Sequence, residues 1–229
     1  MPEEEFASPH RRRVTSNALG IGLATGAYGL SFGAISIASG LDAWQTQGLS
    51  LLMFTGGSQF ALVGVLGAGG GAVAAVLTAW LLGARNSVYA LSMAPVLRAT
   101  GLRRLAAAQL TIDESTAMAL AHPEPAAAAR HAFWSTGLAV YVLWNIGTLI
   151  GSLGAAAIGD PATLGLDAAI PAAFIALLWP RLVDRSMWAV AGAGAALALL
   201  LTPVLRPGLP VLAAGLVALL AAAILGRRS

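Results

Sequence analysis

The sequence predicts an all-α polytopic membrane protein, and three observations lead to this fold class. Hydrophobic residues make up 58% of the chain and charged residues only 10%, and the mean hydropathy is +0.78. The apolar residues form long continuous runs, such as residues 191–201 and 213–225, that brief polar breaks separate. Soluble domains have a smaller apolar share, and a membrane β-barrel needs alternating polar and apolar residues. A transmembrane helical bundle of about seven or eight spans is therefore expected.

The apolar runs give the elements in order. A polar cytoplasmic tail is expected over residues 1–15, before a single transmembrane domain over residues 16–229. The predicted spans cover residues 16–40, 48–66, 72–97, 105–121, 132–158, 164–179, 187–201 and 209–225. The first span is dense in glycine, which lets helices approach closely or unwind around a ligand. The second and third are interrupted by polar residues at 55–59 and 85–87, so glycine-broken or polar-broken helices are expected there.

The basic residues are all arginine, and their clusters lie at the ends of apolar runs, where arginines set the orientation of membrane helices. They cluster at residues 11–13, 98–104, 181–185 and 227–228. Both chain ends are therefore expected in the cytoplasm, and the pI near 10.2 does not indicate nucleic-acid binding. With eight spans, residues 98–104 lie on the outer side. If one of the two interrupted stretches is re-entrant, the count falls to about seven, and the sequence leaves both topologies open.

Several function classes lack the residues that they require. Cysteine is absent, which excludes disulfides and thiolate metal ligands. Residues 67–71 are rich in glycine, but no lysine follows them, so they do not form a nucleotide-binding loop. No Ser/His/Asp or zinc-type grouping stands out, so we expect neither an enzyme nor a metal or other cofactor. A short repeat, residues 40–43 against 165–168, is consistent with the internal repeats of secondary transporters.

Three polar groups interrupt the apolar runs, and the first is Phe54-Thr55-Gly56-Gly57-Ser58-Gln59-Phe60. Each glycine weakens a helix by about 1 kcal/mol relative to alanine. A helix broken there exposes backbone groups that can bind the carboxylate and the ammonium of an amino acid. The substrate-binding residues predicted from this segment are Thr55, Gly56, Gly57, Ser58 and Gln59. The alternative is a helix-packing notch in which Gln59 bonds to a neighbour.

The second group is Arg85 with Asn86, which lies about a dozen residues inside its apolar run, too deep for the side chain to reach water easily. A guanidinium at that depth needs a carboxylate, from Asp113, from Glu114 or from the substrate. Arg85 and Asn86 are therefore predicted to belong to the substrate site. The alternative places Arg85 at the membrane interface, between two half-spans.

The third group is the acid pair Asp113 and Glu114, within the apolar residues 105–121. A charge at the centre of a membrane helix costs about 2.5–3.5 kcal/mol on insertion scales, so such residues are usually functional. Neighbouring side chains on a helix point about 100° apart, so only one of the two is expected to face a small site. One acid would pair with Arg85 and the other would carry a proton in a cavity. The alternative is a surface helix with solvated acids.

These groups, in this order, resemble the AzlC family, the large subunit of branched-chain amino-acid exporters. The family pattern has a Phe-x-Gly-x-Ser-Gln-Phe block, an arginine before a Tyr-x-x-Ser-x-x-Pro stretch, and an Asp-Glu pair. Here the matching positions are residues 54–60, Arg85 with residues 89–95, and Asp113 with Glu114. The Gly-Leu-Asp at residues 165–167 and the overall length extend the likeness over most of the chain.

The resemblance implies export of branched-chain amino acids such as valine, leucine and isoleucine, driven by an ion or proton gradient rather than by ATP. It also implies a small, separately encoded membrane partner of the AzlD type. On this basis we predict a transporter subunit in the inner (plasma) membrane, in contact with lipid and a small amino-acid substrate and with no nucleic acid. Two alternatives from other classes are a non-transporting scaffold subunit and a small-solute channel.

Overall fold

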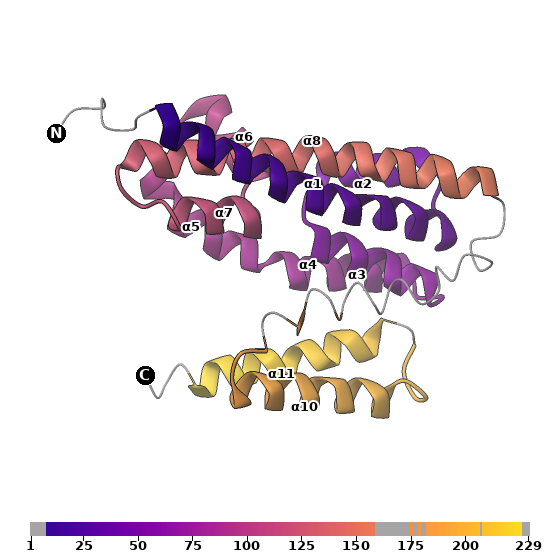
Figure 1. The fold of residues 1–229 in the computed structure, drawn as a ribbon. Helices are drawn as coiled ribbons and strands as arrows, with labels where there is room; N and C mark the ends of the chain where they lie inside the picture. The colour runs from indigo at the N-terminus through magenta and orange to yellow at the C-terminus, as the bar shows by residue number, and fades with distance from the viewer. Residues whose placement is uncertain (1–7, 159–174, 176–177, 180–181, 207, 226–229) are drawn as a thin grey trace.

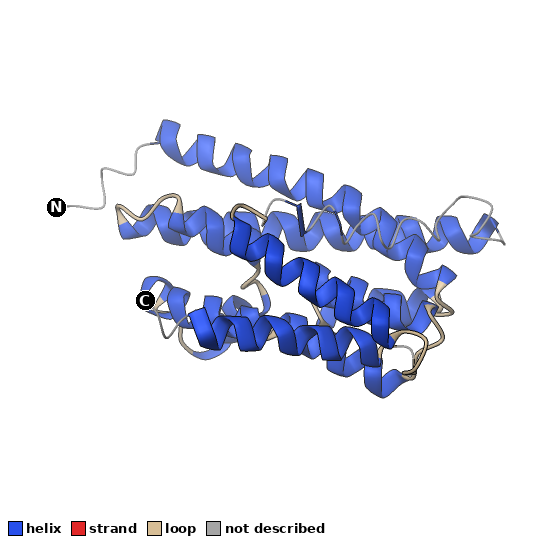
Figure 2. Cartoon of the chain, turned by 90° about the horizontal axis from the view of Figure 1, so that it is seen from below, coloured by secondary structure: helices blue, strands red, loops and turns tan. Residues whose placement is uncertain are grey.

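The structure, a computed structural model, describes residues 8–158, 175, 178–179, 182–206 and 208–225. Within this part of the chain every regular element is a helix, which confirms the all-α prediction (Figure 2). The helices are α1 (Ser8–Ala38), α2 (Ala43–Leu52), α3 (Gly56–Gly67), α4 (Ala72–Gly83), α5 (Arg85–Leu97), α6 (Gly101–Gln109), α7 (Asp113–Leu120), α8 (Ala126–Ile158), α10 (Arg185–Leu201) and α11 (Leu209–Leu225). The predicted span at residues 164–179 lies almost wholly outside the described residues, and the repeat at 165–168 lies entirely outside them.

Two of the described helices are long and apolar enough to cross a membrane, judged by length and composition. They are Pro9–Ala38 of α1, with a mean hydropathy of 1.4, and Ala126–Ala157 of α8, with 1.5. At about 1.5 Å per residue each exceeds the roughly 30 Å hydrocarbon core. Helix α1 begins at Ser8, so the expected tail is helical from there onward. The arginines at residues 11–13 explain this, because arginine is a good helix former.

Helices α1 and α8 run parallel and pack backbone to backbone (Figure 1). A methyl group on Gly22 would lie 2.9 Å from the carbonyl carbon of Ala139, and one on Gly26 would lie 2.9 Å from the carbonyl oxygen of Leu143. Further along, a methyl on Gly151 would overlap the backbone of Leu30. The glycine-rich face of α1 therefore serves close helix packing, which is one of the two alternatives that the sequence left open.

A helical hairpin, α2–α3, enters the bundle from the end at which α1 stops. Helix α2 starts directly after α1, capped by Asp42, whose carboxylate accepts the Gln45 N–H at 2.8 Å. Helix α3 returns to the same end, because its last residue, Gly67, lies against Ser39 just after α1. A methyl group added to Gly67 would lie 2.7 Å from Ser39 Oγ. The chain reverses at residues 53–55, where the double glycine begins α3. The predicted break is confirmed, and the chain folds back on itself there.

A second hairpin, α6–α7, enters from the opposite end (Figure 1). Helix α6 begins beside the start of α8, because Thr100 and Arg130 line a common cavity. Helix α7 returns to that end, where the ring of His122 meets the ring of His10 at 5.5 Å. The uninterrupted span predicted over residues 105–121 is therefore wrong. The number of complete membrane crossings stays a prediction.

Helices α4 and α5 together form one interrupted helix, which runs from the end of α1 back to the start of α8. Its break falls at Ala84, just before Arg85, where the sequence predicted one. Helix α5 ends at Leu97, and its C-cap residue, Arg98, has a left-handed backbone with φ 46°. On the outer face of α4 lies the α10–α11 pair; a methyl on Gly215 of α11 would meet the side chain of Leu81.

Candidate functional site

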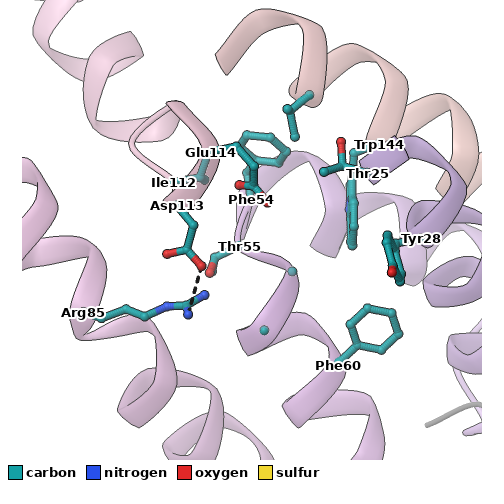
Figure 3. A pocket seen from close by; sticks show the side chains of 13 residues that line it. Thr25, Tyr28, Phe54, Thr55, Phe60, Arg85, Ile112, Asp113, Glu114 and Trp144 are labelled. Carbon is teal, nitrogen blue, oxygen red and sulfur yellow. Dashed lines mark ion pairs between the residues drawn. The ribbon is translucent and has the colours of Figure 1, made fainter. Parts of the chain in front are cut away.

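The tips of the two hairpins, α2–α3 and α6–α7, meet the break between α4 and α5 at one cavity of about 140 Å³ (Figure 3). Helices α1 and α8 complete its wall. The lining residues are Thr25, Tyr28, Phe54, Thr55, Gly56, Gly57, Phe60, Arg85, Ile112, Asp113, Glu114, Val140 and Trp144. Sites for drug-sized molecules usually measure about 300–1,000 Å³, so this one suits a small solute.

An ion pair crosses the cavity between two of the breaks. Arg85 is the first residue of α5 and Asp113 is the first residue of α7. Arg85 Nη1 lies 3.0 Å from Asp113 Oδ2, with 33% and 26% of the two side chains exposed. The sequence offered Asp113, Glu114 and the substrate as partners for Arg85, and the structure pairs Arg85 with Asp113. Charged groups that are half-buried at broken helices are a common feature of transporter substrate sites.

The double glycine brings the start of α3 close to this ion pair. A methyl group on Gly57 would lie 3.3 Å from Arg85 Nη2, and one on Gly56 would lie 3.1 Å from the indole of Trp144. Thr55 precedes α3 in an extended conformation, and its side chain makes no capping hydrogen bond. The first-turn N–H groups of α3 are thus available to an anion, at the positive end of the helix dipole.

Both acids border the cavity. The expectation that only one of Asp113 and Glu114 could face a small site is wrong, because both line it. They occupy the first turn of α7 rather than the middle of a helix, and acids at that position stabilise a helix start. Ser115 fixes the break before them, since its hydroxyl donates to Leu110 O at 2.6 Å and accepts from Ile112 N at 3.2 Å.

Aromatic rings form the apolar side of the cavity. Phe60 meets Trp144 edge to face at 6.2 Å, and Phe32 stacks behind Trp144 at 6.1 Å. Phe54 meets Tyr141 edge to face at 4.9 Å. These contacts hold the rings in place, so the cavity combines one charged side with one rigid apolar side. That combination suits a solute that carries a charged end and an apolar end.

Neighbouring helices hold the broken end of α2. The carbonyl of Leu51 accepts from Gln109 Nε2 at 2.8 Å and from the Tyr141 hydroxyl at 3.2 Å. Farther along α2, Gln47 Nε2 donates to Asn145 Oδ1 at 3.1 Å. Freed carbonyls at a helix end need such partners when they are away from water. The tip of the hairpin is therefore fixed to α6 and α8.

Three residues predicted to bind substrate do not line the cavity: Ser58, Gln59 and Asn86. Gln59 is fully buried and donates to Leu49 O at 3.2 Å, as the packing alternative proposed. Ser58 packs against Gly83, the last residue of α4. A methyl group added to Gly83 would lie 3.1 Å from the Ser58 hydroxyl. Asn86 follows Arg85 on α5 and is half-buried. Thr55, Gly56, Gly57 and Arg85 do line the cavity, and their role in binding stays a prediction.

Sequence reasoning missed the cavity residues on α1 and α8, namely Thr25, Tyr28, Val140 and Trp144. One signal could have found Trp144. Tryptophan in a membrane helix usually lies at the interface, whereas Trp144 lies well inside α8 and is 6% exposed. The other three carry no comparable signal, since each fits an ordinary apolar span.

Residues 20–158 match the family model described as AzlC protein. The chain belongs to the AzlC family. The matched residues cover every position that lines the cavity, so the cavity lies within the part of the chain that defines AzlC proteins. The AzlC family consists of membrane proteins linked to transport rather than of enzymes.

A curated relative supports the membrane assignment. An uncharacterized membrane protein of Helicobacter pylori is 29% identical to this AzlC-family chain over 126 residues, which is 55% of either chain. The chain thus spans about half the length of that relative. No solved structure matches the chain.

Proposed function

We propose that this AzlC-family chain is the large subunit of a secondary transporter that exports branched-chain or similar small apolar amino acids across the inner membrane. A gradient, rather than ATP, would drive export, and a small AzlD-type membrane protein would complete the transporter. The observation that carries the proposal is the Arg85–Asp113 ion pair, which lies in a small cavity between broken helices and opposite an aromatic wall.

The two ends of the ion pair match the two charges of an amino acid. The substrate carboxylate would bind Arg85 and the first-turn N–H groups of α3, and its ammonium would bind Asp113. The apolar side chain would then lie against Phe60 and Trp144. In the empty site Arg85 and Asp113 neutralise each other, so neither charge is left without an opposite charge between rounds of transport.

Glu114 is our candidate for proton coupling. Glu114 borders the cavity from the position on α7 next to Asp113, the residue that pairs with Arg85. A carboxylate that binds and releases a proton beside the substrate would link the two fluxes, because its charge changes what the site can hold. Asp113 would then serve substrate binding.

The hairpins provide a means of alternating access. Helices α2–α3 enter from one end and α6–α7 from the other, and their tips meet at the cavity. Movement of one hairpin would open the cavity to one side while the other hairpin keeps it closed. Arg98, Arg103 and Arg130 gather at the end where α1 and α8 begin. By the positive-inside rule we assign that end, with the N-terminus, to the cytoplasm. The C-terminus would lie on the same side.

Efflux from vesicles tests the proposal. The full chain, with and without the AzlD-type protein, would be reconstituted into vesicles loaded with labelled valine, leucine or methionine, and release would be followed with an imposed proton gradient. We expect saturable efflux of leucine and valine from the complex. Arg85→Gln, Asp113→Asn and Glu114→Gln should each insert and fold but lose gradient-driven efflux.

The same experiment separates the two alternatives. A scaffold subunit would release nothing above empty vesicles, and both acid variants would lower stability instead of changing a transport rate. A channel would release solute without saturation and without dependence on the gradient. Either result would contradict the proposed exporter.

A further inference from the structure

A second cavity, of about 330 Å³, lies at the end of the bundle where α1 and α8 begin. Three arginines from three different elements line it: Arg98 at the end of α5, Arg103 on α6 and Arg130 on α8. Trp134, one turn beyond Arg130, forms part of its wall. The AzlC substrate cavity contains none of these residues.

The charge in this cavity is positive and uncompensated within the described residues. None of the three guanidinium groups forms an ion pair with a carboxylate there, and Arg98 bonds only to the carbonyl of Pro95, at 3.4 Å. Helix α6 starts at the cavity, and its N-cap residue, Thr100, makes no side-chain capping bond. Guanidinium groups and free helix N–H groups are the donors that phosphate oxygens require. The cavity therefore suits an anion with several oxygens.

The surroundings favour a phosphate that is attached to a lipid. On α6, Leu102 and Leu105 flank Arg103 and are 83% and 68% exposed. Trp134 lies in the first turns of an apolar helix, where aromatic residues meet lipid headgroups. A free phosphate ion would gain nothing from exposed leucines, whereas the acyl chains of a lipid would cover them. Basic pockets between membrane helices commonly bind anionic headgroups.

We propose that Arg98, Arg103 and Arg130 bind the phosphate of an anionic phospholipid headgroup, whose acyl chains lie against the exposed leucines of α6. The site connects α5, α6 and α8 at the base of the α6–α7 hairpin. A lipid held there would fix the hairpin that carries Asp113 into the AzlC substrate cavity. The proposal concerns lipid binding and does not depend on which solute is exported.

Native mass spectrometry of the purified full chain tests this site. The protein would be titrated with phosphatidylglycerol, with phosphatidylcholine of the same acyl chains, and with inorganic phosphate. We expect phosphatidylglycerol to remain bound at concentrations at which the other two do not. A basic residue near an anionic headgroup is worth about 1 kcal/mol, or about fivefold in affinity. The Arg98→Gln/Arg103→Gln double variant should therefore bind about 25-fold more weakly.

Arg104→Gln is the matched control, since Arg104 is the next residue on α6, is exposed and does not line the cavity. Its affinity for phosphatidylglycerol should equal that of the unaltered chain. Arg130→Gln, from a different helix, gives an independent second variant, and thermal unfolding in detergent verifies that each variant folds. Equal binding of both lipids, or equal loss in the control, would overturn the proposal. Binding of inorganic phosphate without a preference for phosphatidylglycerol would overturn the lipid assignment.

Discussion

Arg85 and Asp113 connect α5 to the α6–α7 hairpin across the AzlC cavity, with Nη1 of the arginine 3.0 Å from Oδ2 of the aspartate. Each residue is the first of its helix, so the pair fixes the start of α5 against the start of α7. Because Arg85 belongs to α5 and Asp113 to the α6–α7 hairpin, any movement of that hairpin relative to α5 has to break or reorient the pair.

Removing one member of the pair should strongly reduce transport. With Arg85→Gln we expect kcat/KM for leucine efflux to fall about 30-fold or more, because truncating one partner of a desolvated charge pair costs about 2–5 kcal/mol. The pair is about a third exposed, so the lower end of that range applies. The measurement is the initial rate of efflux from vesicles. The double variant Arg85→Asp/Asp113→Arg should regain thermal stability but not transport, and regained transport would reduce the pair to a structural role.

Adding a methyl group at Gly57 should weaken substrate binding without unfolding the protein. The new carbon would lie 3.3 Å from Arg85 Nη2 and would displace the guanidinium by a few tenths of an ångström. We expect KM to rise about three- to tenfold, while stability stays equal or increases, since alanine favours helix by about 1 kcal/mol over glycine. Gly48→Ala on α2 is the control, because nothing lies within 4 Å of its added carbon. An unchanged KM in Gly57→Ala would contradict our placement of the carboxylate.

Enlarging the apolar side of the cavity should change the preference among substrates. Val140 lines the cavity and is 3% exposed, whereas Val142 on the same helix is 49% exposed. Val140→Ala should shift the ratio of kcat/KM toward larger side chains by about 1–3 kcal/mol at most, the range for one methylene in an apolar pocket. Competition between leucine and valine measures this ratio. Val142→Ala should leave it unchanged, and an equal shift in both variants would exclude Val140 from the specificity wall.

Gln59 should prove to be structural rather than a substrate ligand. Its amide donates to Leu49 O, which also accepts the Met53 N–H at 2.9 Å, so this carbonyl keeps a partner when Gln59 is lost. Gln59→Leu should lower stability by about 1 kcal/mol or less and leave KM within about twofold. Thermal unfolding and efflux kinetics measure the two quantities. A large rise in KM at unchanged stability would support the binding role predicted from sequence.

The contact between α1 and α8 should tolerate no added volume. Gly151→Ala would drive a methyl group into the backbone of Leu30, whereas Gly154→Ala, on the same helix, meets nothing within 4 Å. We expect the first variant to lose about 1–3 kcal/mol, the usual cost of overpacking, and the second to lose none. Thermal unfolding in detergent compares them. Equal unfolding temperatures would show that α1 and α8 do not pack in this way.

Local chemistry explains which parts of the fold the sequence could predict. The double glycine at residues 56–57 and the polar residues around Arg85 both weaken a membrane helix, and the structure breaks the helices there. The break before Asp113 was missed, because residues 105–121 read as one apolar run apart from the acids. Whether a helical stretch crosses the membrane or returns depends on contacts between distant segments, such as Gly67 with Ser39, that no local pattern contains.

The site was predictable to the extent that its residues are costly in a membrane. A buried charge has to have a partner, so Arg85 and the acid pair could be linked from sequence alone. Which acid pairs with Arg85 depends on the break before α7. Thr25, Tyr28 and Val140 reach the cavity only because α1 and α8 pack against the two hairpins. Their residue types would suit any span, and so sequence gave no reason to select them.

The parallel pairing of α1 with α8 has a consequence for biosynthesis. Thr15 and His131, which bond at 2.9 Å near the start of the contact, are 116 positions apart along the chain. During translation the glycine-rich face of α1 is therefore exposed to lipid or to the insertion machinery until the ribosome has synthesised α8. Truncations that stop before residue 126 should accordingly be cleared by membrane quality-control proteases, whereas those that extend past residue 158 should accumulate.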